Sequence, residues 1–208
     1  MKVAVMSPLP LRIRSKSDYK QFLQADLRAH GLRSWRFDYR WRHPALRFQR
    51  ALRRVEYLQT CQGAVSRVLR FIARFDLERW SLATGIVIQP GVCGPGLSIA
   101  HPGTLIVNSR AQIGAFCRLH PLVTIGIADG GVPTIGDFVY VGPGAVIYGS
   151  VHVGDQAVVG ANSVVSKDVP PMSTVAGAPA RVVGARGSAR LMPSFYPLAD
   201  DVRLDETL

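Results

Sequence analysis

The most constraining feature of this sequence is an aliphatic residue that recurs at every sixth position. From Ile135 the chain reads IGDFVY, VGPGAV, IYGSVH, VGDQAV, VGANSV and VSKDVP. Four earlier hexads, which begin at 107, 113, 119 and 125, share this phase and are separated from the later ones by the insertion 131–134. Neither a helix nor a simple strand has this period, whereas short strands joined by tight corners do. Three hexads would close one triangular coil, and coils would stack at about 4.8 Å.

The first part of the chain has a different pattern. Apolar residues at three- and four-residue spacings predict two or three helices within 18–31, 43–63 and 64–85. The expected helical core is Tyr19, Phe22, Leu23, Leu27, Leu46, Phe48, Leu52, Val65, Val68, Leu69 and Ile72. The sequence therefore predicts an α+β protein that is mainly β: a helical region over 1–84, a repeat domain over 85–184 and a tail over 185–208.

The positive charge is confined to the predicted helical region. Of the 25 Lys and Arg residues, 18 lie in residues 1–84 with 6 of the 14 acids, although the whole chain has a net charge of +11. Such a region is typical of a contact for phosphates, anionic lipid headgroups or an acidic polymer, but a solvated arginine-rich helix surface would look the same. Nucleic-acid binding is not expected, because no aromatic platform or known reader motif accompanies the charge.

Cysteine usage and the N-terminus indicate the compartment. Cys61, Cys93 and Cys117 are an odd number without close metal-ligand spacing, so neither a disulfide framework nor a zinc site is indicated. The first residues, MKVAVMSPLPLRIR, lack a signal-peptide core, and no apolar run reaches membrane-spanning length. We expect a cytoplasmic protein, with contact to the inner face of the membrane through the basic region as a further expectation.

The repeat and two further segments resemble a known family. The hexads, the segment GPGLSIAHPGTLIVN at 94–108 and the ending VPPMSTVAGAPARVVG at 169–184 are similar to the hexapeptide-repeat acyltransferases. The resemblance covers about residues 85–184 and implies a left-handed parallel β-helix. The helical N-terminal region and the ending most resemble serine-acetyltransferase-like enzymes of capsule and exopolysaccharide synthesis. The resemblance to this family implies acetyl-CoA as co-substrate, no metal, and a homotrimer with active sites between neighbouring subunits.

Two histidines are the candidates for the reaction. The resemblance makes His101 the general base, which would take the proton of an acceptor hydroxyl during direct attack on the thioester. The residues add that the rung 94–100 is one residue longer than a hexad, a break at which side chains are re-aimed. Stacking by three hexads places His120 near His101, as a substrate-binding residue. Alternative interpretations are a hydrogen-bonded core histidine for His101 and a solvated residue for His120.

Other residues are assigned to the co-substrate and the acceptor. Small residues at Gly142, Ala161 and Ala178 would leave room for the pantetheine arm, while Lys167 and Arg181 would meet phosphates. Asn108 would bind acceptor or co-substrate, or else cap a corner. Both charged residues have an alternative as solvated surface groups. Cys93 and Cys117 suggest a covalent route, but packing is the better interpretation of Cys117.

The acceptor is inferred from departures from the family pattern. Serine acetyltransferases have an aspartate directly before the histidine, where this chain has Ala100, and Arg-His-Pro where it has Gly131-Val132-Pro133. A further family aspartate falls at Ile86 or Val87. We therefore predict that the acceptor is a hydroxyl of a capsular or exopolysaccharide sugar, neutral or acidic. The alternatives are serine O-acetylation for cysteine biosynthesis and a non-catalytic β-helix assembly protein. A metal-dependent hydratase would need a third histidine, and His152 does not fit the coil spacing.

Overall fold

The structure is a computed structural model that describes residues 12–197, and its first part is helical. The helices are α1 (Lys16–Arg28), α2 (Tyr39–Arg42), α3 (Pro44–Thr60) and α4 (Ala64–Thr84). Ser15 caps α1 by accepting a hydrogen bond from the Asp18 backbone N–H, while the Asp18 carboxylate accepts from the Ser15 N–H. α4 ends at Gly85, whose φ of 74° is in the left-handed region that glycine adopts without strain. The three predicted helical segments are confirmed, and α2 is an additional short helix.

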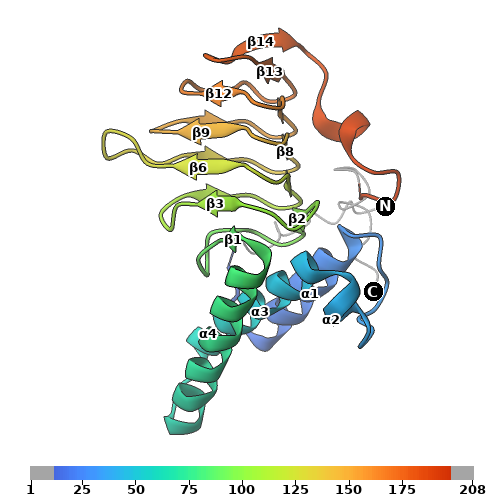
Figure 1. Ribbon diagram of the computed structural model, residues 1–208, viewed down its shortest axis with the longest axis vertical. Helices are drawn as coiled ribbons and strands as arrows, with labels where there is room; N and C mark the ends of the chain where they lie inside the picture. Colours follow the sequence, from blue (N-terminus) through green and yellow to red (C-terminus); the bar gives the residue numbers. More distant parts are fainter. Residues whose placement is uncertain (1–11, 198–208) are drawn as a thin grey trace, which may run out of the picture.

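The rest is a left-handed parallel β-helix, as the sequence predicted (Figure 1). Its first sheet contains β1 (Ile86–Val87), β3 (Leu105–Val107), β6 (Thr124–Gly126), β9 (Val146–Tyr148) and β12 (Val164–Val165). The second contains β4 (Gln112–Ile113), β7 (Thr134–Ile135) and β10 (His152–Val153). The third contains β2 (Ser98–Ile99), β5 (Arg118–Leu119), β8 (Tyr140–Val141), β11 (Val158–Val159), β13 (Thr174–Ala176) and the antiparallel β14 (Arg181–Gly184).

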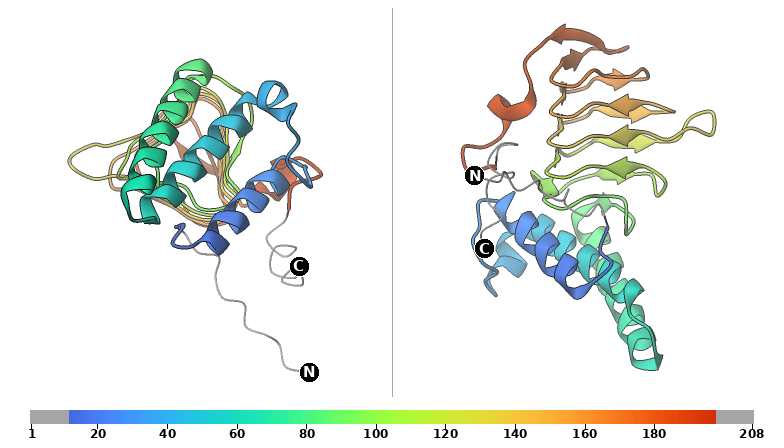
Figure 2. Two further views of the ribbon diagram at one scale, coloured as in Figure 1. Left: turned by 90° about the horizontal axis from the view of Figure 1, so that it is seen from below. Right: turned by 180° about the vertical axis from the view of Figure 1, so that it is seen from behind.

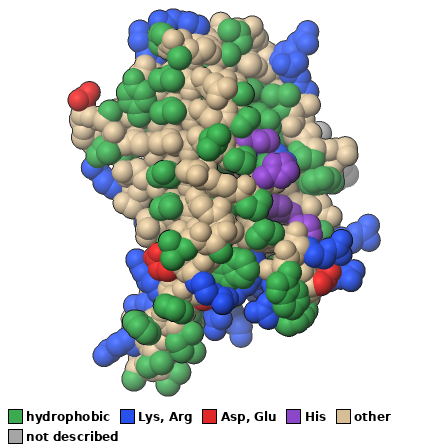
Figure 3. Space-filling view, in the orientation of Figure 1, with side chains coloured by type: hydrophobic (Ala, Val, Ile, Leu, Met, Phe, Trp, Pro, Cys, Tyr) green, Lys and Arg blue, Asp and Glu red, His purple; other side chains and the backbone are tan. Residues whose placement is uncertain are grey.

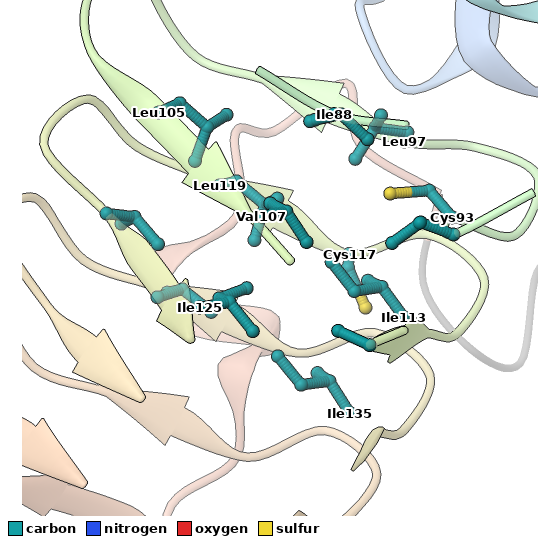
Figure 4. Close-up of a cluster of buried hydrophobic side chains, with 14 of the residues drawn as sticks. Ile88, Cys93, Leu97, Leu105, Val107, Ile113, Cys117, Leu119, Ile125 and Ile135 are labelled. Carbon is teal, nitrogen blue, oxygen red and sulfur yellow. The ribbon is translucent and has the colours of Figure 1, made fainter. Parts of the chain in front are cut away.

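The sixfold period corresponds to the interior of the prism. All ten predicted aliphatic positions are buried: Val107, Ile113, Leu119, Ile125, Ile135, Val141, Ile147, Val153, Val159 and Val165. Figure 4 shows how such side chains from successive coils point into the same core. In the regular upper coils each residue pairs with the residue three hexads later, as Val141 does with Val159. Each added coil therefore buries three more aliphatic side chains, which explains why the period is kept.

Three coils depart from the three-hexad repeat. The uppermost is shorter, since Val153 pairs with Val169 and Val159 with Val175. The other two are longer. Ile99 pairs with Leu119 rather than with Cys117, because eight residues instead of six separate Ile99 from Val107. The predicted long rung at 94–100 is wrong, since Cys93 and Ile99 are one hexad apart and pair with Ile113 and Leu119. Ile113 pairs with Ile135 rather than with Gly131, since the four-residue insertion is accommodated outside the prism. There Ala128 and Gly131 form an antiparallel bridge within the loop that projects from the stack between β6 and β7 (Figure 1). The core positions stay in phase because the extra residues all lie at corners.

The helices cover the lower end of the prism, as seen from below in Figure 2. A buried arginine of α3, Arg53, holds this contact together. Its guanidinium donates to the Asp26 carboxylate of α1 at 2.9 Å, to Glu56 at 3.1 Å, and to the backbone carbonyls of Cys93 and Gly94 at 2.8 and 2.7 Å. The carboxylates in turn accept from Leu97 and Gly91 N–H groups. The first coil is thus hydrogen-bonded to two helices through one cation.

Electrostatics explain why Arg53 stays charged although its side chain is fully buried. Burial alone would lower the pKa of its guanidinium, but the attraction of Asp26 and Glu56 outweighs burial and raises that pKa. Burial raises the pKa of Glu56, and the charge of Arg53 counteracts this effect. Arg53 and Glu56 therefore depend on each other for their charge states.

One part of the predicted helical core is wrong. Val65, Val68 and Ile72 are between 52 and 73% exposed, and Leu69 is also exposed. α4 packs on α3 through Ala73 and Leu77, and its first turns extend beyond the other helices (Figure 1). Phe22, Leu27, Leu46, Phe48 and Leu52 are buried as predicted, whereas Tyr19 and Leu23 are only partly so. Within residues 12–197, no helix is long and apolar enough to cross a membrane.

The segment after β14 packs back along the prism. It includes the short helix η1 (Ser188–Leu191) and ends at Tyr196, which is buried and donates from its hydroxyl to the Phe116 carbonyl at 2.9 Å. Tyr196 packs with Ala25 and Ala29 of the helical region. The C-terminal segment therefore joins the top of the prism to its helical base.

We predict that Arg53→Ala lowers the free energy of unfolding by about 3–5 kcal/mol, because it leaves Asp26 and Glu56 buried without their cation. Urea denaturation followed by circular dichroism measures this loss. Arg54→Ala, at the exposed neighbouring position, is the matched control and should change stability by no more than about 0.5 kcal/mol. A loss below about 1 kcal/mol for Arg53→Ala would show that the network does not hold the helices to the prism.

Candidate active site

His101 lies at the corner where the chain leaves the third sheet and enters the first, between β2 and β3. Its side chain is exposed and makes no hydrogen bond to any residue in the range 12–197. A buried core histidine, the alternative interpretation from the sequence, is therefore wrong. An exposed imidazole at a prism edge is accessible to substrate and leaves both ring nitrogens available for proton transfer.

His120 lies one coil above, at the same corner. The backbone N–H of Ala100 donates to the Leu119 carbonyl, which places His120 over Ala100 and next to His101. The predicted stacking interval of three hexads is wrong here, because Ile99 pairs with a residue two positions beyond that interval, Leu119. The two histidines are nevertheless neighbours, since Ala100, directly before His101, follows Ile99 just as His120 follows Leu119, with which Ile99 pairs. Figure 3 shows histidine side chains gathered on one face, above Lys and Arg side chains.

His120 is held as a neutral imidazole. Burial, followed by the positive charge of Arg118 and by His101, lowers the pKa of His120 to about 4. Its ring packs against Tyr140, with ring centroids 4.9 Å apart. Its Nε2 is buried and has no hydrogen-bond partner among the described residues. A buried polar nitrogen without a partner is costly, and this one becomes available to a hydroxyl or carbonyl group of a substrate once the side chains that cover it move aside.

Arg118 is a residue of this corner that sequence reasoning missed. It lies on β5, half-buried, and donates from Nη1 to the Ser98 hydroxyl at 2.8 Å. Its positive charge opposes protonation of His120, which follows it closely along the chain. The sequence could have indicated this residue, because Arg118 directly precedes the inward-facing Leu119. Side chains alternate along a strand, so Arg118 points out of the third sheet, beside Tyr140.

Small side chains continue upward from the histidines along the same corner. Gly142 follows His120 by one coil, and Ala161 lies above Gly142. A Cβ atom on Gly142 would approach the Ala161 nitrogen to 2.8 Å, so packing alone requires glycine there. Ala178 is exposed near the top of the stack, and Arg181 pairs with Ala176 on β14. Four of the predicted co-substrate residues are thus brought to one edge, above the two histidines.

Two predicted residues lie at another corner. Asn108 and Lys167 follow strands of the first sheet and lie where the chain turns toward the second. The Asn108 side chain accepts from the Arg110 N–H at 2.9 Å, so it caps its turn, as the alternative interpretation held. The Lys167 side chain is exposed. Within one chain, neither residue is brought to His101.

The positions at which this chain differs from the serine acetyltransferase pattern lie in different parts of the prism. Ala100 lies beside His101, and Val87 is exposed on β1, whereas Ile86 is buried. Gly131, Val132 and Pro133 belong to the loop before β7, at the corner between the first and second sheets. None of these positions therefore supplies a charged group to the histidines within one chain.

The two cysteines inside the prism are poor nucleophiles. Cys93 and Cys117 are buried in the prism, and Figure 4 shows both side chains in the core. Burial raises the pKa of Cys93 to about 12 and that of Cys117 still further. Packing is the correct interpretation for Cys117, and a thiolate route is not supported. Between residues 12 and 197, no three His, Cys, Asp or Glu side chains cluster as metal ligands would.

Comparisons of sequence and of structure both find serine acetyltransferases among the relatives of this chain. The family model described as "Bacterial transferase hexapeptide (six repeats)" matches residues 133–167. The serine acetyltransferase of Mycobacterium tuberculosis (strain ATCC 25618 / H37Rv) is 37% identical over 120 residues, which are 55% of this chain and 52% of that protein. The serine acetyltransferase of Helicobacter pylori (strain J99 / ATCC 700824) is 37% identical over 118 residues, which are 54% of this chain and 69% of that protein.

The fold of a solved relative extends the match into the helical region. The crystal structure of serine acetyltransferase from Brucella abortus strain S19 superposes with a TM-score of 0.65 at 29% identity, covering 82% of this chain and 71% of that one. The chain spans about half the length of the first curated relatives that it matches. These relatives favour serine over the polysaccharide acceptor predicted from the sequence.

We predict that His120 makes stability fall as the pH is lowered. Unfolded imidazole takes up a proton below about pH 6.5. Folded His120 resists protonation to about pH 4, so acid favours the unfolded state within this window. His120→Gln should show a smaller loss of unfolding free energy between pH 7.5 and pH 5 than the wild type, measured by urea denaturation at about these two pH values.

His120→Gln should keep part of the dependence of unfolding free energy on pH, because burial also lowers the pKa of His30. His152→Gln, which replaces an exposed histidine of β10, is the control and should keep the wild-type slope. If His120→Gln keeps it as well, the imidazole of His120 is not held neutral.

Proposed function

Because the chain belongs to the hexapeptide-repeat transferases and is homologous to serine acetyltransferases, we propose that it is an acetyl-CoA-dependent O-acetyltransferase with His101 as general base. The observation that carries the proposal is the edge shared by an exposed histidine, a neutral second histidine and a column of small residues. Retention of the co-substrate residues Ala161, Ala178 and Arg181 on that edge speaks against the assembly-protein alternative.

The reaction follows from the properties of the two imidazoles. A neutral acceptor hydroxyl is a weak nucleophile, so His101 removes its proton as the oxygen attacks the thioester carbonyl of acetyl-CoA. The tetrahedral intermediate collapses with cleavage of the carbon–sulfur bond, and the imidazolium of His101 returns its proton to the leaving thiolate. His120, neutral and with Nε2 unpartnered, hydrogen-bonds the acceptor or the developing oxyanion. No covalent enzyme intermediate is required.

The co-substrate is proposed to lie along the column above the histidines. Ala161 and Ala178 have small, exposed side chains, which leave room for the pantetheine arm. Arg181 is exposed at the upper end of the column and can pair with a phosphate. Lys167 lies at a different corner, so it would contribute only if a second prism lay against the first.

We propose that such a second prism is present in a homotrimer. The outer face of the first sheet presents a column of apolar residues in which Val87 and Ile106 are 42 and 44% exposed. On α4, Phe71 and Phe75 are 77 and 70% exposed. Apolar surface of this extent on a sheet and a helix favours contact with other copies of the chain. A site between prisms would also bring Asn108 and Lys167 of one subunit toward His101 of another.

The names of the relatives favour serine as the acceptor. A hydroxyl of an acidic or neutral sugar is a second candidate. It is favoured by Ala100, by Ile86 or Val87, and by the loop from Gly131 to Pro133, where serine acetyltransferases have the groups expected to hold an amino acid. The basic helical region is then proposed to attract an anionic polymer or the membrane surface. Both candidates require the same proton transfer to His101.

We predict that His101→Ala lowers kcat by about 10²-fold or more and leaves the melting temperature and acetyl-CoA affinity nearly unchanged, because only proton transfer in the transition state is lost. Steady-state kinetics, thermal melting and calorimetry with acetyl-CoA measure the three quantities. The rate should also fall in acid for the wild type, since a protonated imidazole cannot accept a proton, and the variant should lack this dependence.

His152→Ala is the matched control, because it removes an exposed histidine from the second sheet. It should keep the wild-type rate. We would abandon His101 as the base if its folded alanine variant, with wild-type sedimentation, kept more than about a tenth of the activity. Absence of acetyl-CoA binding by the wild type would overturn the proposed function itself.

The acceptor is tested by release of free CoA in the presence of single acceptors. If serine is the acceptor, release should rise with L-serine concentration, saturate, and depend on His101. Release no faster than in buffer would exclude serine. The sugar candidate is supported in that case if an acidic oligosaccharide accelerates release and L-serine does not.

A further inference from the structure

The helical region contains a cleft that the proposed acetyl transfer does not use. It lies between α1, the loop before α2, and α3, and has a volume of about 330 Å³. Its lining consists only of aromatic residues and arginines: Tyr19, Trp35, Phe37, Arg40, Arg47, Arg50 and Arg54. The volume is at the lower end of the range for small-molecule sites.

Helix geometry concentrates the charge there. Residues 47, 50 and 54 follow one another at three- and four-residue spacings, so their side chains share one face of α3. Arg40 of α2 adds a fourth guanidinium from across the cleft. Like charges at such spacings weakly destabilise a helix, so an anion bound between them would relieve this repulsion.

The charges are poorly compensated within the described part of the chain. Arg47 pairs with Asp76 at 2.7 Å, but no carboxylate of residues 12–197 forms an ion pair with Arg40, Arg50 or Arg54. The nearby Asp38 pairs with Arg36 and Arg42, outside the cleft lining. Arg50 is half-buried, and its burial lowers its pKa. An anion entering the cleft would therefore meet partly dehydrated guanidinium groups, which bind anions more strongly than hydrated ones.

The aromatic rings position these guanidinium groups. Arg50 lies over Trp35, 4.6 Å from the ring centroid, and Arg40 lies over Phe37 at 4.9 Å. Stacking fixes the plane of each guanidinium, which loses less rotational freedom when it binds an anion. The rings also add a flat apolar surface to a site that would otherwise recognise only charge.

We propose that this cleft is a binding site for an acidic sugar, one whose ring carries a carboxylate or phosphate. The arginines would bind the anionic group through charge-assisted hydrogen bonds, and the aromatic rings would contact the apolar face of the sugar ring. A recessed site fits such a compact unit better than it fits a flat membrane surface. This site is separate from the acetyl-transfer edge and does not depend on which hydroxyl is acetylated.

Calorimetry with the full chain and an oligogalacturonate, without acetyl-CoA, tests the proposal. Arg50→Gln/Arg54→Gln should weaken binding by at least about tenfold, which corresponds to the loss of one charge-assisted hydrogen bond. Arg67→Gln/Arg74→Gln on α4 removes the same charge outside the cleft and should change the affinity by less than about twofold. Arg54→Gln alone replaces an exposed side chain, and it provides a variant that folds if the double variant does not.

The other probes separate an acidic sugar from other anions. Trp35→Ala should weaken oligogalacturonate binding more than inorganic pyrophosphate binding. Both ligands lose the positioning of Arg50, but only the sugar also loses a ring contact. Equal losses from the α3 and α4 double variants would overturn the proposal, as would equal affinity for a neutral malto-oligosaccharide of the same length. Tighter binding of phosphatidylglycerol vesicles or ADP through the same arginines would assign the cleft to a membrane or a nucleotide instead. None of these results depends on acetyl transfer, so the two proposals fail separately.

Discussion

The buried ion-pair network around Arg53 is the interaction on which the joining of helices and prism depends. A β-helix ends in an open coil whose backbone groups have no further coil to pair with. Here the carbonyls of Cys93 and Gly94 accept from Arg53, and the N–H groups of Gly91 and Leu97 donate to Glu56 and Asp26. Since a guanidinium donates in several directions within one plane, a single side chain links α1, α3 and the first coil. An apolar side chain could fill the space but not bind these groups.

Once this end is capped, the inward aliphatic residues determine where chemistry can take place. Each coil keeps its buried residues in phase and places every extra residue at a corner, where solvent is available. His101 lies within the longer segment between Ile99 and Val107, and His120 occupies the same corner one coil above. The regular core thus presents two imidazoles on a rigid edge. Their different environments separate their proposed roles: His101 is exposed and accepts protons, while His120 stays neutral and binds through Nε2.

The charged residues are distributed differently at the proposed catalytic edge and in the helical region. The edge has two histidines and Arg118 but no carboxylate at Ala100 or Val87, whereas the helical region carries most of the arginines. Homology to serine acetyltransferases and the absence of these carboxylates point toward different acceptors. Both are compatible with one mechanism, because a hydroxyl needs the same base whatever molecule carries it. The arginine cleft is a separate feature of the helices, positioned by their packing and not by the repeat.

The sequence alone determined the β-helix, its ten buried positions and the helical region, because a period of six and a local helical pattern are both readable along the chain. The role of His101 stays a prediction. Only the tertiary structure decided where corner residues meet. It placed Asn108 and Lys167 away from His101, paired Ile99 with Leu119 rather than Cys117, and exposed Val65, Val68 and Ile72. Corner length and helix docking depend on contacts between distant segments, such as Arg53 with Asp26 and Gly94, and local periodicity contains no record of those contacts.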